Sequence, residues 1–455
     1  MSICGVKFRA YPTQDQAKIL SQWIGCARVI YNCKVEEDQN NYKKFKETAE
    51  IGLVHQAYAH FKTKERSWLK EVPSQILRNS ASNWYQAKQR FFKGLAKNPR
   101  IKVRGKRDSV LLTQELFLLI EETNTDGEII KRLKIGTKRH DLGFLKIHCH
   151  RPCGAPKQIV ISKKHNKWFV SFCYETGEEN LSEETILSTY TNMTEDELKK
   201  ITVGIDRGVV IPFQLSNETR FNFDEATEKR LLKKTKRLKK YQRRMADQQK
   251  GSQSRNRTKQ KIGKLHTKIA NINHNFCHET SHQLAHSEAL VFSVEDLSLK
   301  NMTKKPKPIA DQNGRYLPNQ RKAKAGLNRA LLSKGLGKTI DFLAYKARQV
   351  GKCVVYVSAY HSSQECAECC HIHPGNRKTQ AIFLCLSCGH QANADINAAK
   401  VIAKRGIQHL LSKPKLKTKT RLGTSRSYVG RGISKTTEVL VTSTQVPLTP
   451  EARTL

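Results

Sequence analysis

The chain has 455 residues, of which 82 are Lys or Arg and 40 are Asp or Glu, so its formal net charge is +42. An excess of this size indicates a long polyanion as partner, because each neutralised phosphate releases condensed counterions and so favours binding. No apolar run approaches the length of a membrane span and the N-terminus does not resemble a signal peptide, so we expect no membrane partner and a cytoplasmic location.

The first 175 residues combine strand patterns with a helical excursion. Thr13–Gln16 has the pattern of a capping box, and apolar residues then recur at helical spacing from 20 to 31. A second helix is predicted to begin with Ser74 as its cap. Further on, two alternating segments flank His165 and Asn166, which predicts a hairpin with its turn at these residues. We therefore expect a small sheet or barrel that carries a helical insert.

Residues 177–199 are acidic and poor in apolar side chains, and we interpret them as a linker. The segment that follows, I-T-V-G-I-D-R-G, predicts a strand that ends at Asp206 and a glycine-bearing turn. A later apolar run, A-L-V-F-S-V-E-D, places Glu295 just after another strand. These strands suit an RNase H-like fold, in which a carboxylate on the first strand is a metal ligand.

Residues 228–268 contain seventeen Lys or Arg and two acids. Apolar residues at helical intervals allow a buried stripe on either side of Gly251-Ser252, which predicts two basic helices joined by a polar turn. A solvated charged surface is the simpler interpretation of most charge runs. Here the imbalance is so one-sided that the helices would repel themselves without an anionic partner. The residues that we expect to contact nucleic acid are Arg237, Lys240, Arg243 and Arg244.

Four cysteines in the pattern C-x2-C-x15-C-x2-C match the spacing of a structural zinc site. Four thiolates close the tetrahedron and leave no position for a catalytic water, so the zinc would fold the ribbon rather than take part in chemistry. Neighbouring Cys370, His371, His373 and His390 leave some ambiguity in the ligand assignment. The ligands that we favour are Cys366, Cys369, Cys385 and Cys388.

Asp395 follows the ribbon near the start of an alanine-rich helix and adds a third carboxylate to Asp206 and Glu295. Taken singly, the three have ordinary explanations: a turn cap, a surface acid at a strand end, and a first-turn acid favoured by the helix dipole. Together they match the need of phosphodiester hydrolysis for two divalent cations about 4 Å apart. Magnesium suits a ligand set made only of oxygens. Asp296 is an alternative to Glu295, although strand alternation would direct it elsewhere.

Several motifs carry a resemblance to one family. They are K-F-R-A-Y-P-T with Gln16, A-R-V-I-Y-N at 27–32, F-F-K-G followed by P-R-I-K, G-I-D-R-G, S-V-E-D-L, S-S-Q-E-C-A-E-C, and C-x2-C-G-H before A-D-I-N-A-A. Over residues 3–403 the chain resembles the transposon-encoded TnpB family of RNA-guided DNA endonucleases, which is related to compact type V CRISPR effectors. Asn393 stands where relatives often carry another acid, a departure that spares Asp395.

The resemblance implies a multidomain α/β protein with two lobes. A guide RNA would direct it to complementary double-stranded DNA beside a short flanking motif, and one site with Asp206, Glu295 and Asp395 would cut both strands. Family members contact that motif through the recognition helices, which makes Gln75 and Asn79 candidates here. The implied parts are a wedge-type β-barrel (1–12 and 98–176), a helical recognition insert (13–97), a linker (177–199), an RNase H-like (RuvC) nuclease domain (200–362 and 391–404), an inserted zinc ribbon (363–390) and a basic, disordered tail (405–455).

A DNA-binding repressor and a transposase are the alternatives to a guided nuclease. A guide-dependent DNA-binding repressor would use the same scaffold with a dead site, but it would have no need to keep mutually repelling carboxylates together. Transposase activity proper finds no support, because no tyrosine or serine nucleophile lies in a recognisable recombinase setting. Tyr241 and Tyr345 are better explained as helix-packing residues.

Overall fold

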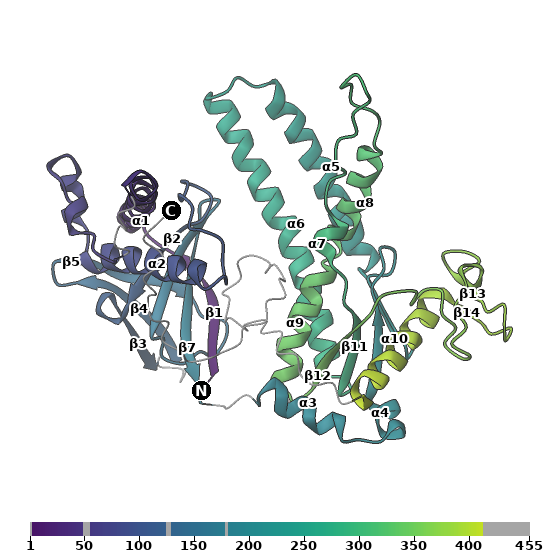
Figure 1. The fold of residues 1–455 in the computed structure, drawn as a ribbon. Helices are drawn as coiled ribbons and strands as arrows, with labels where there is room; N and C mark the ends of the chain where they lie inside the picture. The colour runs from purple at the N-terminus through teal and green to yellow at the C-terminus, as the bar shows by residue number, and fades with distance from the viewer. Residues whose placement is uncertain (1, 49–54, 124–128, 178–180, 413–455) are drawn as a thin grey trace, which may run out of the picture. The chain divides into compact units, whose positions relative to one another are not determined.

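The computed structural model describes residues 2–48, 55–123, 129–177 and 181–412 (Figure 1). Residues 405–411, which we predicted as part of a disordered tail, continue helix α10 (Ala394–Leu411), and from 413 onward that prediction lies outside the described residues. Within the described ranges, no helix is both long enough and apolar enough to cross a membrane.

The N-terminal part contains a seven-stranded antiparallel sheet with the order β2-β6-β7-β1-β5-β4-β3. Because its edge strands, β2 and β3, do not pair with each other, the sheet is open: the predicted wedge-type β-barrel is wrong, and the alternative of a small sheet is confirmed. Alternation along a strand shows which face is buried, but it does not show whether the two edges of a sheet meet. The strands are β1 (Ser2–Tyr11), β2 (Asp108–Thr113), β3 (Phe117–Thr123), β4 (Ile129–Thr137), β5 (His140–His148), β6 (Gln158–Lys164) and β7 (Lys167–Thr176).

Helices α1 (Gln14–Thr48) and α2 (Ser74–Phe92) pack on this sheet around one shared core. The predicted capping box is confirmed, because the Thr13 amide donates to Gln16 Oε1 at 3.1 Å and the Gln16 amide donates to Thr13 Oγ1 at 3.3 Å. Ser74 lies inside α2, one residue past the capping position, so its predicted role as cap is wrong. The short 3-10 helices are η1 (Ala59–Phe61), η2 (Lys64–Glu71) and η3 (Gln114–Leu116).

The predicted hairpin between β6 and β7 is confirmed. Lys164 pairs with Lys167, which leaves His165 and Asn166 as a two-residue turn with φ of 48° and 62°. Positive φ at both central residues is the turn geometry whose twist matches that of the flanking strands.

A second sheet has five strands in the order β10-β9-β8-β11-β12. Strands β8, β11 and β12 are parallel, and β9 is antiparallel to both of its neighbours. The strands are β8 (Thr202–Asp206), β9 (Phe213–Leu215), β10 (Arg220–Phe221), β11 (Val291–Glu295) and β12 (Cys353–Val357). The helices of this part are α5 (Glu225–Asp247), α6 (Gln253–Ala285), α7 (Leu299–Met302), α8 (Arg321–Ser333), α9 (Leu336–Gln349) and α10, and the cysteine-rich segment holds η4 (Pro374–Asn376), β13 (Ile382–Leu384) and β14 (Gln391–Asn393).

Most of the acidic segment that we interpreted as a linker is helical, with α3 (Glu183–Thr191) and α4 (Glu195–Ile201). The acids of both helices face solvent, whereas Ile186, Tyr190 and Leu198 are buried in a cluster with residues of β12 and α10. A few apolar residues are enough to hold a helix when they fall on one face, and an acidic composition hides that spacing.

Helix α10 lies directly on the five-stranded sheet because small residues allow a close approach (Figure 1). A Cβ atom on Gly204 of β8 would lie 2.0 Å from the carbonyl oxygen of Ala399. Gly406 leaves room for Ser293, whose Oγ donates to the carbonyl oxygen of Ile402 at 2.7 Å. These contacts hold α10 against strands β8 and β11 of the sheet.

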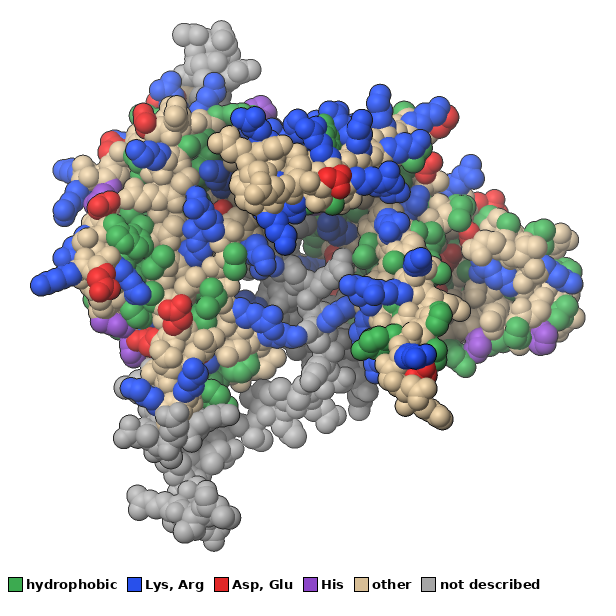
Figure 2. Space-filling view, turned by 90° about the horizontal axis from the view of Figure 1, so that it is seen from above, with side chains coloured by type: hydrophobic (Ala, Val, Ile, Leu, Met, Phe, Trp, Pro, Cys, Tyr) green, Lys and Arg blue, Asp and Glu red, His purple; other side chains and the backbone are tan. Residues whose placement is uncertain are grey.

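Helices α5 and α6 are the predicted pair of helices joined by a turn, and they pack together as a long hairpin that extends away from the five-stranded sheet (Figure 1). Leu238 of α5 is buried against Ile262 and Leu265 of α6, with Tyr241 and Ile269 packed beside them. The basic side chains occupy the outer faces of the pair, and on the face seen in Figure 2 Lys and Arg side chains outnumber Asp and Glu.

Candidate active site and zinc site

Two of the predicted acids lie at neighbouring strand ends. Asp206 is the last residue of β8 and Glu295 is the last residue of β11, and these strands pair in parallel with Ile205 opposite Val294. Adjacent strands of a sheet lie about 5 Å apart, so the register brings the two carboxylates to the same edge. Glu295 is buried and Asp206 is partly buried.

The third acid, Asp395, lies in the first turn of α10. Asn393 caps this helix, because its Oδ1 accepts hydrogen bonds from the amides of Asp395 at 3.0 Å and of Ile396 at 3.3 Å. This cap fixes the helical turn that carries Asp395. Asn393 therefore has a structural role, and an acid at the same position could cap the helix equally well.

The three acids interact electrostatically. Burial, followed by the charges of Glu295 and Asp395, raises the pKa of Asp206 from 3.8 to about 7. Two carboxylates that oppose the ionisation of a third are an arrangement that a divalent cation would stabilise.

The three acids are less closely grouped than the four cysteines. Among the described residues, only the four cysteines place one ligand atom each within 4.8 Å of all the others, so the three carboxylates are more widely spread. A single Mg²⁺ binds oxygens at about 2.1 Å, and its ligands therefore lie no more than about 4.2 Å apart. A pair of ions about 4 Å apart accepts a wider set of oxygens. Binding of two magnesium ions by the three acids stays a prediction.

Two arginines at this site were not predicted. Arg377, between the cysteine pairs, donates from Nη2 to Asp395 Oδ1 at 3.2 Å, and its charge offsets a small part of the rise in the pKa of Asp206 that burial and the two acids cause. Arg207 is half-buried next to Asp206 in the chain and donates from Nη2 to the main-chain oxygen of Glu295, and desolvation lowers the pKa of its guanidinium. Arg377 lies in an irregular spacer with no periodicity to mark it. Arg207 directly follows Asp206 in the sequence, and this adjacency could have identified it as a residue of the site.

Glu295 also accepts a hydrogen bond from the loop that joins β12 to the ribbon. Ser362 Oγ donates to Glu295 Oε1 at 2.7 Å, and the two residues are only 5% and 6% exposed. Arg405 of α10 donates to the main-chain oxygen of Ser358 at 2.7 Å and forms an ion pair with Glu365. One helix therefore holds both ends of this loop and also carries the third acid.

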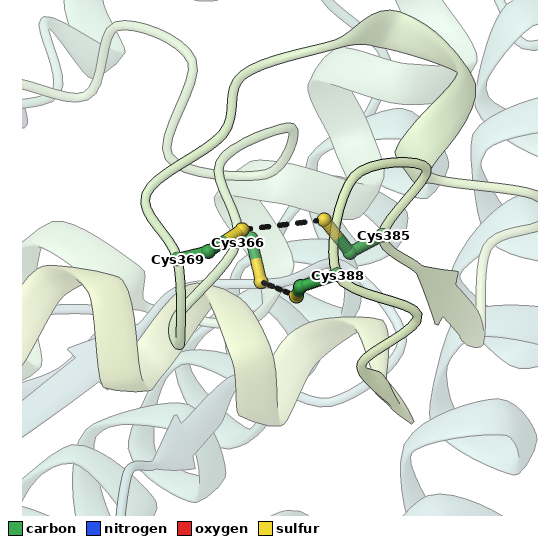
Figure 3. A group of neighbouring side chains, drawn as sticks. All are labelled: Cys366, Cys369, Cys385 and Cys388. Atoms are coloured by element: carbon green, nitrogen blue, oxygen red, sulfur yellow. Dashed lines mark hydrogen bonds between the residues drawn. The ribbon is translucent and has the colours of Figure 1, made fainter.

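The four predicted cysteines meet in space and point toward one another (Figure 3). The Sγ atoms of Cys366 and Cys388 are 3.7 Å apart, and those of Cys369 and Cys385 are 3.5 Å apart. A tetrahedral zinc with bonds of about 2.3 Å separates its sulfur ligands by about 3.8 Å, so the geometry fits this ion. Among the described residues, this group contains neither Cys370 nor any of the three nearby histidines, in agreement with the ligands that we favour.

The candidate nucleic-acid contacts differ in exposure. Gln75 is half-buried, and Asn79 is buried, where its Nδ2 donates to the main-chain oxygen of Leu111 at 3.4 Å and to Thr113 Oγ1 at 3.3 Å. Asn79 is thus occupied within the fold, and contact with a flanking motif stays a prediction for both residues. Four of the basic residues of α5 are the predicted nucleic-acid contacts; all four are exposed, and within the described part of the chain none of them forms an ion pair with an acid. They are Arg237, Lys240, Arg243 and Arg244.

Three family models match consecutive parts of the chain. They are described as a helix-turn-helix domain at residues 1–47, a probable transposase at 171–305 and a Cas12f1-like TNB domain at 337–402. In the structure, residues 1–47 hold strand β1 and most of helix α1.

Relatives match between about half and nearly nine-tenths of the chain. "Putative RNA-guided DNA endonuclease InsQ" of Escherichia coli (strain K12) is 29% identical over 401 residues, which cover 88% of this chain and 91% of that protein. The CRISPR-associated endodeoxyribonuclease Cas12f1 of Sulfoacidibacillus thermotolerans is 27% identical over 56% of this chain and 54% of that protein. A solved structure of the mini-RNA-guided endonuclease CRISPR-Cas_phi3 aligns over 91% of this chain and 93% of that chain, but at 10% identity its TM-score of 0.48 is too low to establish a shared fold. The predicted resemblance to the TnpB family is confirmed by the family models and the relatives.

Proposed function

We propose that this chain is an RNA-guided DNA endonuclease that cleaves double-stranded DNA complementary to its guide, beside a short flanking motif. The observations that carry the proposal are that Asp206 and Glu295 end adjacent parallel strands, and that burial and the charges of Glu295 and Asp395 oppose the ionisation of Asp206. The names of the relatives, RNA-guided DNA endonuclease and Cas12f1, support the same activity.

The acids would hold two Mg²⁺ ions, which when bound activate a water and stabilise the leaving oxygen of the phosphodiester. Asp206 and Glu295 supply oxygens from adjacent strand ends, and Asp395 supplies oxygens from the first turn of α10. Arg377 holds Asp395 in place by its ion pair, and its guanidinium lies where it can offset negative charge beside the acids. The described chain therefore supplies both the anionic ligands and a cation at the same edge.

Helix α5 and the N-terminal part of the chain would bind nucleic acid. Among the described residues, the exposed cations at the middle of α5 lack acidic partners, so the phosphates of a guide–target duplex are the charges that would neutralise them. The N-terminal sheet with α1 and α2 is the part that we assign to the wedge and recognition roles, and Gln75 is the better placed candidate for motif contact because it is not fully buried.

A guide-dependent repressor without cleavage is the alternative. Such a protein gains nothing from an aspartate whose charge is opposed by burial and by two neighbouring acids, and replacement of Asp206 by a neutral residue would relieve that cost. Retention of all three acids favours cleavage.

The test begins with RNA that copurifies with the full-length protein. Sequencing should identify one structured RNA, and replacement of its guide segment should redirect cleavage of a plasmid to the new complementary sequence. Cleavage that ignores the guide, or purification free of any specific RNA, would instead favour an unguided nuclease.

A further inference from the structure

We propose that Ser362 is a positioning residue for the acid cluster, and that its hydroxyl holds Glu295 in the orientation in which this carboxylate binds a divalent cation. The proposal rests on the proposed function, because it assigns a role at the same site. It concerns a residue outside the three acids, in the loop that leads from β12 into the zinc ribbon.

The hydrogen bond between the two side chains is specific. Ser362 Oγ lies 2.7 Å from Glu295 Oε1 and 3.2 Å from the main-chain oxygen of Ala359. A hydroxyl has one proton to donate, and a bond to a carboxylate is stronger than a bond to a neutral carbonyl. We therefore assign the proton to Glu295. One of the two carboxylate oxygens is then fixed by the protein, and the carboxylate keeps free lone pairs for a cation.

The loop around Ser362 is preorganised. His361 adopts φ of 56°, its main-chain oxygen accepts from the amides of Gln364 at 2.9 Å and Glu365 at 3.0 Å, and its Nδ1 lies 2.7 Å from Gln364 Oε1. This tight turn directs the next residue, Ser362, toward Glu295. Because the turn is closed by its own hydrogen bonds, the position of the hydroxyl is set before any cation binds.

The same loop links the acids to the ribbon. Arg405 holds the loop at Ser358 and at Glu365, on either side of Ser362. Asn397 of α10 fixes the first residues of the ribbon, because its Oδ1 accepts from the amide of Ala367 at 2.9 Å and its Nδ2 donates to the main-chain oxygen of Glu365 at 2.7 Å. The loop that contains Ser362 is thus held by α10, the helix that carries Asp395. The positions of Glu295 and Asp395 therefore both depend on the contacts of α10 with this loop.

The test compares variants of the full-length, zinc-loaded protein. Partners that orient a metal ligand change metal affinity by about 10-fold to 100-fold when they are removed. We expect Ser362→Ala to weaken Mn²⁺ binding, measured by electron paramagnetic resonance, at least about 10-fold, and to raise the Mn²⁺ concentration for half-maximal cleavage by a similar factor. Ser362→Thr keeps the hydroxyl and should remain close to wild type.

The matched control is Ser363→Ala, because Ser363 is half-buried and makes no side-chain hydrogen bond within the described residues. It should leave both Mn²⁺ readouts unchanged. Melting temperature and zinc content are measured for every variant. Should Ser362→Ala lose its fold, Ser362→Cys keeps a similar volume with a weak donor and carries the same expectation.

Each outcome bears on one proposal. Mn²⁺ binding by folded Ser362→Ala at wild-type strength, or equal losses in Ser362→Thr and Ser363→Ala, would overturn the role of Ser362. Asp206→Ala separates this result from the proposed function. If Asp206→Ala is inactive while Ser362→Ala matches wild type, only the positioning role fails, whereas continued cleavage by Asp206→Ala contradicts the acid site itself.

Discussion

The raised pKa of Asp206 makes the stability of the folded chain depend on pH, and the substitution Asp206→Asn should remove this part of the pH dependence. The pKa of this carboxyl is raised from 3.8 to about 7 by burial and by the charges of Glu295 and Asp395. Below about pH 4, Asp206 is protonated in both the folded and the unfolded chain, so folding does not have to bury its charge and the free energy of unfolding is not reduced. Between pH 4 and pH 7 the unfolded chain has released the proton while the folded chain keeps it, so stability falls as the pH rises.

The size of the effect follows from the shift. About three pKa units correspond to about 4 kcal/mol, and solvent at the partly exposed carboxylate reduces this to about 2–4 kcal/mol. For a nuclease part of roughly 200 residues, 1 kcal/mol changes the melting temperature by about 2–4 °C. We therefore expect Asp206→Asn, which cannot ionise, to melt roughly 5–15 °C above wild type at pH 8 without added divalent cations, and at nearly the same temperature at pH 4.

The assay is thermal unfolding at several pH values, with the zinc content checked at each. Added Mg²⁺ or Mn²⁺ should raise the melting temperature of wild type at pH 8 far more than that of Asp206→Asn, because cations that bind the folded acid cluster stabilise it. A difference between the two proteins that stays constant from pH 4 to pH 8, or equal stabilisation of both by Mn²⁺, would refute this reasoning.

Three further predictions concern the zinc site, the core and the basic helix. Cys385→Ser should lose zinc and lower the melting temperature rather than reduce only the rate of cleavage, and normal zinc content with a normal melting curve would count against this. Gly204→Ala should destabilise the protein by at least about 3 kcal/mol in chemical denaturation, because its Cβ would meet the Ala399 carbonyl at 2.0 Å; a loss below 1 kcal/mol would mean that α10 can move away freely. Neutralising four exposed cations of α5 should make the fall of log binding affinity with log salt concentration less steep, by up to about 3–4 in slope. The control Lys229→Gln removes a cation already paired with Glu225 and should leave that slope nearly unchanged. An unchanged slope in the fourfold variant would exclude phosphate contacts at these positions. The four positions are Arg237, Lys240, Arg243 and Arg244.

The positions of the acids and cysteines could be predicted because each depends on local sequence. Apolar runs end at Asp206 and Glu295, and the ends of parallel strands meet at one edge of a sheet whatever their separation along the chain. The cysteine spacing needs only one metal ion to bring its two halves together, and the structure places the four Sγ atoms accordingly.

Features that depend on long-range packing could not be predicted. The N-terminal sheet stays open because strands β2 and β3 remain unpaired edges, and the apolar pattern of either strand is the same in an open sheet and in a barrel. Arg377 and Ser362 reach the acids only through the fold of the ribbon and of the loop before it, so no spacing in the sequence marks them. Asn79 falls on the predicted helix, but the register of that helix turns it toward β2.

The most direct test of the acid site is cleavage by Asp206→Ala, assayed in parallel with binding to the same guided target. The account predicts that this variant retains the RNA and binds complementary DNA with nearly wild-type affinity but leaves both strands intact. Cut DNA at a rate near that of wild type would contradict the assignment of Asp206, and with it the proposal that the three acids form the nuclease centre.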